Sequence, residues 1–333
     1  MGNFSRFEFN SIYKPNIVAI GGGTGLSILL RGLKEFTPNI TAIVTVADDG
    51  GGSGILREDL GMLPPGDIRA CLLALANTEP TMEKLLQYRF KEGQLKGQSF
   101  GNLFIAAMNE IYGSFEMAIK ETSNVLSITG KVYPMTLEDV RLNAELENGK
   151  VIKGESIIPQ EVIKEGVRIK RMFMAPKLSY PLTEAVDAIK NADLIILGPG
   201  SLYTSVIPNL LVNNIVETIY NARAPKVYIC NVMTQPGETD GYGALEQVQA
   251  ILNHSREDFL DYVIANIEEI PEETLENYIT DGSKPVMPEP EDKDVLAAIN
   301  IELITERLIE VKKKYIRHDN LLLSKLLIDI AKQ

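Results

Sequence analysis

Apolar and polar positions along the chain predict strands that alternate with helices. Residues 17–20 form an apolar run that is β-branched at three of four positions, which is typical of a buried parallel strand. The turn GGGTG at 21–25 follows at once, and residues 26–36 then carry leucines at the spacing of one helix face. A second apolar run at 40–46 ends at Asp48 and Asp49, before another Gly-rich loop. Residues 16–54 therefore predict a ligand site at the carboxyl ends of two parallel strands.

The same alternation continues beyond this stretch. Periodic segments predict helices at 55–60, 68–77, 82–90, 103–112, 182–191, 210–220, 243–253 and 321–331. Apolar runs predict further strands at 193–197, 226–232 and 261–266. Strands that alternate with helices favour an α/β fold, here a Rossmann-like, mostly parallel sheet with helices on both faces.

The pattern changes at about residue 124. Partial alternation predicts strands at 140–146 and 151–157 around Asn148-Gly149, a strong hairpin signal, and a third strand at 167–174. Residues 269–292 are rich in Glu and Pro and predict an extended linker, and 301–309 fits a strand pair or a helix. We therefore divide the chain into a first Rossmann-like half (15–123), a β-rich insertion (124–178), a second α/β half (179–270) and a C-terminal extension packed on the body (271–333).

Three strand ends carry Gly-rich loops, at 21–25, 50–54 and 198–205. A glycine turn that leads into a helix lets backbone N–H groups approach an anion, and the helix dipole favours negative charge there. The first loop lacks the last glycine of G-x-G-x-x-G, since Leu26 stands there, and no Gly-Lys-Ser/Thr follows it. The sequence thus favours a phosphate-bearing ligand without supporting NAD binding or ATP hydrolysis by motif.

The acidic pair Asp48 and Asp49 admits three interpretations. A carboxylate at the end of the second strand accepts a ribose hydroxyl in nucleotide-binding folds. One or two carboxylates plus substrate phosphates also suffice to bind Mg²⁺. Asp-Asp-Gly is, in addition, ordinary turn chemistry. We rank ligand contact first and a metal second, and expect only one of the two side chains to face the ligand unless the strand ends before Asp48.

Other polar residues lie near predicted helix starts. Asp67 fits the N-cap of the helix at 68–77, which we favour over a ligand contact. Arg69 stands in that helix's first turn, where the dipole disfavours a cation, so an anion beside the glycine loops would explain it. Asn102 either caps its helix or faces the pocket. Arg317, next to His318 and Asp319, either clamps a phosphate or forms a surface ion pair.

Composition narrows the classes of partner. The net charge is −12 and the sequence pI is about 4.9, which argues against non-specific binding to nucleic acid or to an anionic membrane. Cys71 and Cys230 lie in apolar segments and read as buried residues, not as a disulfide or metal ligands. No apolar run reaches about 18 residues, and residues 1–11 lack the apolar core of a signal peptide. We expect a cytoplasmic protein without a membrane span, and a homo-oligomer remains compatible with this.

Seven motifs in chain order resemble the bacterial gluconeogenesis factor family, which is similar to the 2-phospho-L-lactate transferases of coenzyme F420 synthesis. They are VAIGGGTGL at 18–26, ADDGG at 47–51, PPGDIR at 64–69, GNL at 101–103, GPGSLYTS at 198–205, CNVMTQ with GETDG at 230–241, and IRHD at 316–319. The resemblance implies a UDP-N-acetylglucosamine-type ligand and a role in cell shape and envelope synthesis during gluconeogenic growth, without a reaction. The similar transferases instead move a phospho-lactyl-type group from a guanosine diphosphate carrier with Mg²⁺.

Motifs and resemblance together give one set of expected ligand-binding residues. The set is Gly22, Gly23, Thr24, Gly25, Asp48, Asp49, Gly50, Asp67, Arg69, Asn102, Gly198, Gly200, Ser201, Tyr203, Asn231, Thr234, Gln235 and Arg317. The glycine loops would hold a diphosphate, and Asn231, Thr234 and Gln235 would meet base or sugar edges. No catalytic residue is assigned. Mg²⁺, at Asp48 or Asp49, belongs to the transferase alternative, in which the chain acts on a nucleotide diphosphate donor.

This chain departs from the family pattern at two positions. Gly52 stands where the family usually has a second Ser, which removes a hydroxyl that would contact phosphate. Gln98 stands before Ser99, where a His is common, which weakens any acid–base role for that loop.

Overall fold

The body of the protein is a seven-stranded parallel sheet with the order β10-β9-β8-β7-β1-β2-β3. The computed structural model describes residues 13–312 and 315–333, so the expectation for residues 1–11 lies outside the described chain. The strands are β1 (Ile17–Gly21), β2 (Ile40–Val44), β3 (Lys131–Pro134), β7 (Leu194–Leu197), β8 (Lys226–Ile229), β9 (Tyr262–Asn266) and β10 (Glu302–Glu306). The predicted Rossmann-like α/β fold is confirmed.

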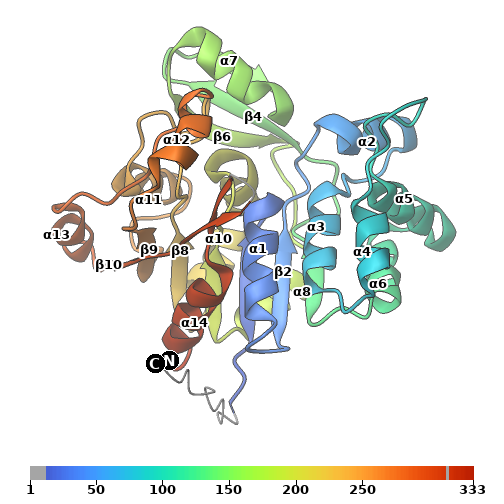
Figure 1. The fold of residues 1–333 in the computed structure, drawn as a ribbon, viewed down its shortest axis with the longest axis horizontal. Coiled ribbons are helices and arrows are strands. Elements are labelled where there is room, and N and C mark those ends of the chain that lie inside the picture. The colour runs from blue at the N-terminus through green and yellow to red at the C-terminus, as the bar shows by residue number, and fades with distance from the viewer. Residues whose placement is uncertain (1–12, 313–314) are drawn as a thin grey trace.

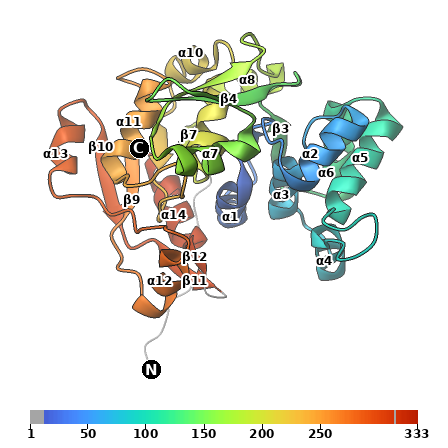
Figure 2. The same cartoon turned by 90° about the horizontal axis from the view of Figure 1, so that it is seen from above.

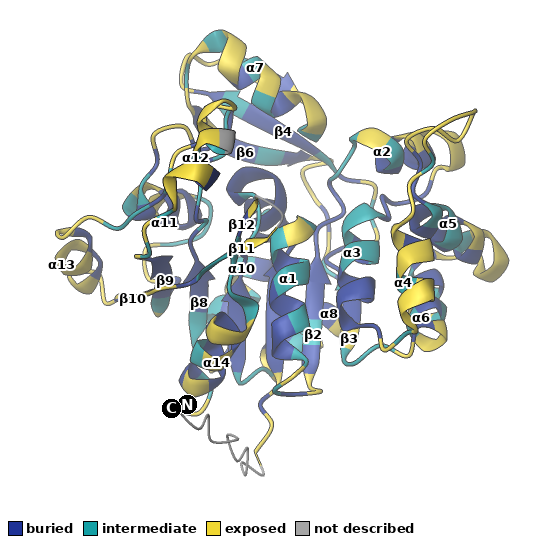
Figure 3. Cartoon of the chain, in the orientation of Figure 1, coloured by how far each residue is buried: buried dark blue, intermediate teal, exposed yellow. Residues whose placement is uncertain are grey.

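Helices cover both faces of this sheet, which is why its central strands are apolar throughout. Every residue of β1 and β7 is buried. On one face α1 (Gly23–Leu33) packs between α3 (Gly66–Leu75) and α14 (Asn320–Ile330), and α8 (Thr183–Lys190) and α10 (Ile215–Tyr220) lie together on the other (Figures 1 and 2). Figure 3 shows the buried core running along the strands between these layers.

The strand order reverses direction at β1 and β7. The chain leaves β1 toward β2 and β3, and it leaves β7 toward β8, β9 and β10. A crevice forms outside the carboxyl ends of strands at such a switch point. The glycine turns after both strands meet there, because a Cβ on Gly25 would lie 2.7 Å from the Pro199 carbonyl oxygen, and one on Gly200 would lie 3.0 Å from that of Gly22. Only glycine allows this backbone contact.

A smaller antiparallel sheet lies across this crevice. It has the order β5-β4-β6 and comprises β4 (Arg141–Leu146), β5 (Val151–Lys153) and β6 (Ile169–Ala175), with α7 (Ile158–Glu165) outside it (Figure 1). The predicted β-rich segment is therefore present, but the strand expected at 151–157 ends at Lys153. The turn η1 (Glu155–Ile157) and α7 follow instead, because the Pro159 ring suits the first turn of a helix. β3 lies within 124–178 yet pairs with β2 in the main sheet.

Helix boundaries differ from the sequence expectations at the glycine loops. α1 begins at Gly23 and not at 26, α2 (Gly51–Leu60) begins at Gly51 and not at 55, and α5 (Phe100–Tyr112) begins before Asn102. The glycine turns are thus themselves the first turns of helices. Of the helix expected at 210–220, only α10 (Ile215–Tyr220) forms. It is preceded by η2 (Leu202–Val206), which lies mostly in the segment expected to be a loop, and by α9 (Ile207–Leu210).

The remaining elements complete the body. They are α4 (Pro80–Gln87), α6 (Phe115–Val125), α11 (Ala244–Asn253), α12 (Glu272–Ile279), α13 (Asp292–Ala297), β11 (Ile309–Lys312) and β12 (Tyr315–His318). The sequence expectations contained neither α6 nor α7, and α12 lies inside the segment expected to be an extended linker. Among the described residues, no helix is both long and apolar enough to cross a membrane.

Candidate functional site

Two cavities flank the turn that leads from β1 into α1. Cavity 1, of about 380 Å³, lies on the side of β7 and β8, and cavity 2, of about 240 Å³, lies on the side of β2. Gly23 and Thr24 line both cavities. The distant glycine turns therefore converge on one region, as the sequence led us to expect.

The structure sorts the expected ligand-binding residues into these two cavities. Cavity 1 is lined by Gly23, Thr24, Gly25, Gly200, Ser201, Asn231, Thr234, Gln235 and Arg317. Cavity 2 is lined by Gly23, Thr24, Asp48, Gly50, Asp67, Arg69 and Asn102. Four expected residues line neither cavity, namely Gly22, Asp49, Gly198 and Tyr203.

The polar wall of cavity 1 is fixed by its own hydrogen bonds. The Gln235 Nε2 donates to Ser201 Oγ at 2.8 Å, which ties the loop after β8 to the turn after β7. Thr234 Oγ1 accepts from the Lys284 N–H at 2.9 Å, and the Asn231 N–H donates to Gln247 Oε1 at 3.0 Å. These contacts leave the side chain of Asn231 available to a ligand edge.

The outer wall of cavity 1 comes from the C-terminal part of the chain. It includes Tyr278 on α12, Ser283, and Ile316, Arg317 and His318 on β12. The Tyr278 hydroxyl accepts a hydrogen bond from the Ile316 N–H at 2.8 Å, so the two segments form one wall. Sequence reasoning missed Tyr278 and Ser283 because they lie in a segment whose Glu and Pro content predicts a linker.

Arg317 is the one Arg or Lys among the described residues that line cavity 1. It is not held in the surface ion pair that we considered, because Asp319 caps α14 by accepting the Leu321 and Leu322 N–H groups at 3.0 Å. Burial lowers the pKa of the neighbouring His318 to about 4, against the hydrogen bond to the Cys230 backbone. His318 is therefore neutral, and Arg317 supplies the positive charge of this cavity.

In cavity 2, Asp67 does not cap its helix, which corrects our preferred interpretation. α3 begins at Gly66, the capping position belongs to Pro65, and Asp67 stands inside the first turn. Its carboxylate instead accepts a hydrogen bond from the Gly23 N–H and lies so close to Gly22 that a Cβ there would be 2.4 Å from Oδ2. Burial, and next the negative charge of Asp48, raise the pKa of Asp67 to about 6.

Asp48 and Asp49 point to different parts of the molecule. Asp48 lines cavity 2, where Oδ1 accepts the Gly50 N–H at 2.9 Å, and burial raises the pKa of this carboxyl. Asp49 faces the smaller sheet, where its two oxygens accept the N–H groups of Glu155 at 3.1 Å and Ser156 at 2.8 Å. Asp49 thus fastens η1 to the body, and Asp48 and Asp67 are the two carboxylates that share cavity 2.

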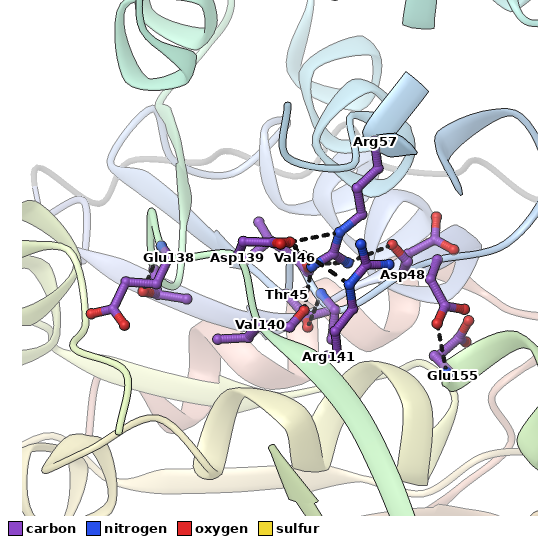
Figure 4. Close-up of polar contacts among 12 residues, drawn as sticks. Thr45, Val46, Asp48, Arg57, Glu138, Asp139, Val140, Arg141 and Glu155 are labelled. Atoms are coloured by element: carbon purple, nitrogen blue, oxygen red, sulfur yellow. Dashed lines mark hydrogen bonds and ion pairs between the residues drawn. The ribbon is translucent and has the colours of Figure 1, made fainter. Parts of the chain in front are cut away.

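Arg57 fixes the position of the Asp48 backbone (Figure 4). Its side chain is buried, its Nη1 donates to the Asp48 carbonyl oxygen at 3.1 Å, and its Nε donates to Asp139 Oδ1 at 2.8 Å. Its Nη2 bonds to the same carboxylate and to the Val140 carbonyl oxygen. One buried guanidinium therefore joins α2, the loop after β2 and the segment that leads into β4.

Two further carboxyl groups lie where the smaller sheet meets this region. Burial, followed by the charges of Asp48 and Asp49, raises the pKa of Glu155 to about 8. Burial raises the pKa of Glu238 to about 7, against hydrogen bonds from Thr204 and the Tyr203 N–H. These groups bind protons near neutral pH, so the negative charge where the smaller sheet meets the body depends on pH.

Tyr203 and His254 are structural contacts beneath the smaller sheet. The Tyr203 hydroxyl lies 2.9 Å from the Tyr242 hydroxyl, and burial raises the pKa of Tyr203 far above its ordinary value. His254 Nε2 accepts the Met172 N–H at 2.8 Å, and Nδ1 lies 2.7 Å from the Ala250 carbonyl oxygen. His254 is therefore neutral and joins β6 to α11, and burial lowers its pKa.

Comparison with known proteins agrees with this fold. The family model of 2-phospho-L-lactate transferase CofD matches residues 17–309. A protein of Thermoanaerobacterium thermosulfurigenes is 58% identical over 323 residues, which are 97% of this chain and 99% of that protein. The gluconeogenesis factor of Bacillus subtilis is 50% identical over 96% of this chain and 99% of its own length. A crystal structure of a Bacillus halodurans protein superposes with a TM-score of 0.90 at 46% identity, over 95% of this chain and 100% of that one.

Proposed function

Because the chain belongs to the CofD family, among relatives named gluconeogenesis factors, we propose that it is a cytoplasmic regulator that binds a nucleotide sugar of the UDP-N-acetylglucosamine type. In this proposal it supports cell shape and envelope synthesis during growth on gluconeogenic carbon sources. No reaction is required for this role.

The observation that carries the proposal is the joining of two glycine turns at the edge of cavity 1. The turns after β1 and β7 touch through backbone atoms at Gly25 and Pro199, so their N–H groups face one space. A diphosphate fits such a cradle, because the dipole of α1 and the N–H groups of its first turn that follow Gly23 favour negative charge; the Gly23 N–H itself is accepted by Asp67. Arg317 lies in the same cavity and would neutralise the second phosphate. Base or sugar edges would meet Asn231, Thr234 and Gln235.

The alternative is a transferase that acts on a nucleotide diphosphate donor with Mg²⁺. Asp48 and Asp67 line the cavity next to the proposed diphosphate position, and among the described residues no group of three or more metal-ligating side chains gathers. Two carboxylates fit Mg²⁺, which keeps waters and takes phosphate oxygens as further ligands. The ion would neutralise charge on a transferred phosphoryl group. The chain's own contribution is to hold Asp48 through Arg57 and Asp67 through the Gly23 N–H.

Calorimetric titration with UDP-N-acetylglucosamine tests the first proposal. We expect saturable binding by the wild type and roughly tenfold or weaker affinity in Arg317→Gln, because one charge-assisted bond to phosphate is lost. Arg223→Gln, at an exposed arginine in the turn after α10, is the matched control and should bind as the wild type does. The absence of binding at millimolar ligand would remove the proposal.

Mass spectrometry after incubation with diphosphate donors and Mg²⁺ tests the alternative, which requires a changed nucleotide.

A further inference from the structure

Cavity 2 is built from the first turns of four helices. Gly23 and Thr24 begin α1, Gly51 to Ser53 begin α2, Gly66 to Ala70 belong to the start of α3, and Asn102 stands in the first turn of α5. In none of these four helices does the capping side chain accept a hydrogen bond. Helix N-termini carry partial positive charge, so four of them around one space favour an anion. The first amides of α1 and α5 are already bonded, to the Asp67 carboxylate and the Tyr88 carbonyl oxygen.

A buried amide oxygen in this cavity has no hydrogen-bond partner in the described part of the chain. The Asn102 residue is 3% exposed, lines cavity 2, and its Oδ1 has no hydrogen-bond partner among the described residues. The two ends of an amide exchange places by rotation about one bond, so Asn102 can present either a donor or an acceptor to a ligand. Buried polar groups are normally paired, and an unpaired one at a cavity wall indicates a missing polar group on the other side.

Two arginines, Arg69 and Arg89, line this cavity, and neither forms a salt bridge within the described residues. Arg69 Nη1 donates to Ser99 Oγ at 3.0 Å, and its buried Nε bonds to nothing in the described chain. Arg89 bonds to the Gly97 carbonyl oxygen. Burial, and next the positive charge of Arg89, lower the pKa of Arg69, and Asp67 opposes this only in part. Two cations that repel one another across a cavity are stabilised by an anion between them.

The cavity also holds two carboxylates. Asp67 accepts the Gly23 N–H and abuts Gly22, and Asp48 accepts the Gly50 N–H and lies 3.4 Å from the position that a Cβ on Gly66 would take. We propose that cavity 2 is a second ligand site, separate from the nucleotide diphosphate site of cavity 1, and that it binds a small phosphate-bearing molecule. The phosphate oxygens meet the N-termini of α2 and α5, the Arg69 and Arg89 guanidinium groups, and the Asn102 amide.

The test separates the two cavities by mutation. Because free phosphate would also enter cavity 1, inorganic phosphate is titrated calorimetrically into Arg317→Gln, in a magnesium-containing chloride buffer of constant ionic strength. We expect one residual site. Adding Arg89→Gln should weaken it roughly fivefold or more, and adding Asn102→Asp, which keeps the shape and introduces negative charge, roughly tenfold or more. Equal midpoints of thermal unfolding in the three proteins show that the fold is retained.

Further titrations identify the source of the phosphate and exclude cavity 1. Ethyl phosphate replaces inorganic phosphate in a parallel series: tighter binding of the ester assigns the site to a phosphate monoester, and tighter binding of inorganic phosphate assigns it to the free ion. In the single variant Arg89→Gln, nucleotide-sugar affinity should stay within roughly twofold of the wild type, since Arg89 does not line cavity 1. Phosphate affinities within twofold of the parent in both double variants, or no residual site in Arg317→Gln, would overturn the proposal.

Discussion

The Asp67 carboxylate accepts a hydrogen bond from the Gly23 N–H, the first amide of α1. This amide is one of those expected to face a ligand phosphate, so in the free protein a carboxylate of the same chain occupies the anion position. A phosphate that reaches Gly23 meets Asp67, and either a proton or a cation must offset the repulsion between them. This contact links ligand binding to charge in cavity 2.

Replacing Asp67 with Asn should remove that dependence on charge. The amide keeps an oxygen for the Gly23 N–H and loses the negative charge, so we expect nucleotide-sugar binding that is tighter than wild type in the absence of Mg²⁺. The wild type should gain affinity when Mg²⁺ is added, and the variant should gain less. Titrations of both proteins with and without Mg²⁺ measure this, and an equal Mg²⁺ effect in the two would contradict it.

The raised pKa of Asp67 also predicts a pH dependence of stability. The folded-state pKa of about 6 lies above the ordinary value of 3.8 for an Asp carboxyl, so its stabilising contribution is complete below pH 4 and is lost as the pH rises through 6. The shift corresponds to about 3 kcal/mol. The free energy of unfolding of Asp67→Asn, minus that of the wild type, should therefore increase by up to that amount between pH 4 and pH 8. Urea unfolding at several pH values measures this difference in unfolding free energy. If the difference does not change with pH, the pKa of Asp67 is not raised in the folded protein.

Arg57 should contribute far more to stability than its partner Asp139. The Arg57 side chain is 2% exposed and that of Asp139 is 67% exposed. Arg57→Met leaves several buried carbonyl oxygens without a hydrogen-bond donor and should lower the free energy of unfolding by about 3 kcal/mol or more. Asp139→Asn should cost less than about 1 kcal/mol, because an exposed ion pair is weak. Urea unfolding of both variants measures the two losses of unfolding free energy. A larger loss in Asp139→Asn than in Arg57→Met would contradict the prediction.

The contact between the two glycine turns should be intolerant of a methyl group. In Gly25→Ala the Cβ would lie 2.7 Å from the Pro199 carbonyl oxygen, so the turns must separate. We expect a loss of about 2 kcal/mol or more in unfolding free energy and no detectable nucleotide-sugar binding. Gly51→Ala is the control for backbone strain alone, since its φ is +49° and no atom lies within 4 Å of the added Cβ. It should cost about 1 kcal/mol and leave binding at cavity 1 measurable.

The two departures from the family pattern lie in contact. A Cβ on Gly52 would lie 2.9 Å from Gln98 Oε1, and Gln98 is buried. Gly52→Ser should therefore destabilise the protein, and Gln98→Ala should destabilise it less when Ser is present at 52. A double-mutant cycle of unfolding free energies should give a coupling of about 1 kcal/mol. If the two substitutions change the unfolding free energy additively, the loop around residue 98 moves away from the serine side chain at position 52 without cost, and the prediction is wrong.

His254 should hold the smaller sheet only in its neutral form. Protonation removes the acceptor for the Met172 N–H, so this contribution is present above the unfolded pKa of about 6.5 and is lost as the pH falls below it. His254→Ala should cost about 2 kcal/mol at pH 8, and His254→Gln, whose amide oxygen can accept the same bond, should cost less. Hydrogen exchange at the Met172 amide should accelerate in the alanine variant. Unchanged exchange would show that another acceptor replaces the imidazole.

The sequence predicted the sheet well because its central strands are buried on both faces and read as continuous apolar runs. It also predicted which loops meet, because the carboxyl ends of parallel strands share one edge. It misplaced helix starts at Gly23 and Gly51, since a glycine run looks like a loop whether or not its amides are helical. It gave Asp67 a capping role, because local spacing cannot show that the side chain turns toward a distant amide.

The outer wall of cavity 1 was the least predictable part of the site. Arg317 was identified through its motif, but Tyr278 stands in a segment whose composition favours a linker. That segment is helical, and the hydrogen bond from the Ile316 N–H to the Tyr278 hydroxyl ties it to the hairpin of β11 and β12. Tertiary packing of this kind leaves no periodic signal in the chain.

The position of β12 has a consequence for protein synthesis. Cavity 1 is lined by the glycine turn at 23–25 and by Arg317, and the ribosome adds Arg317 long after that turn. Since polypeptides begin to fold from the N-terminal side as they emerge, the glycine turns can form before their cationic partner exists. A nascent chain therefore has no complete binding pocket until β12 has been synthesised.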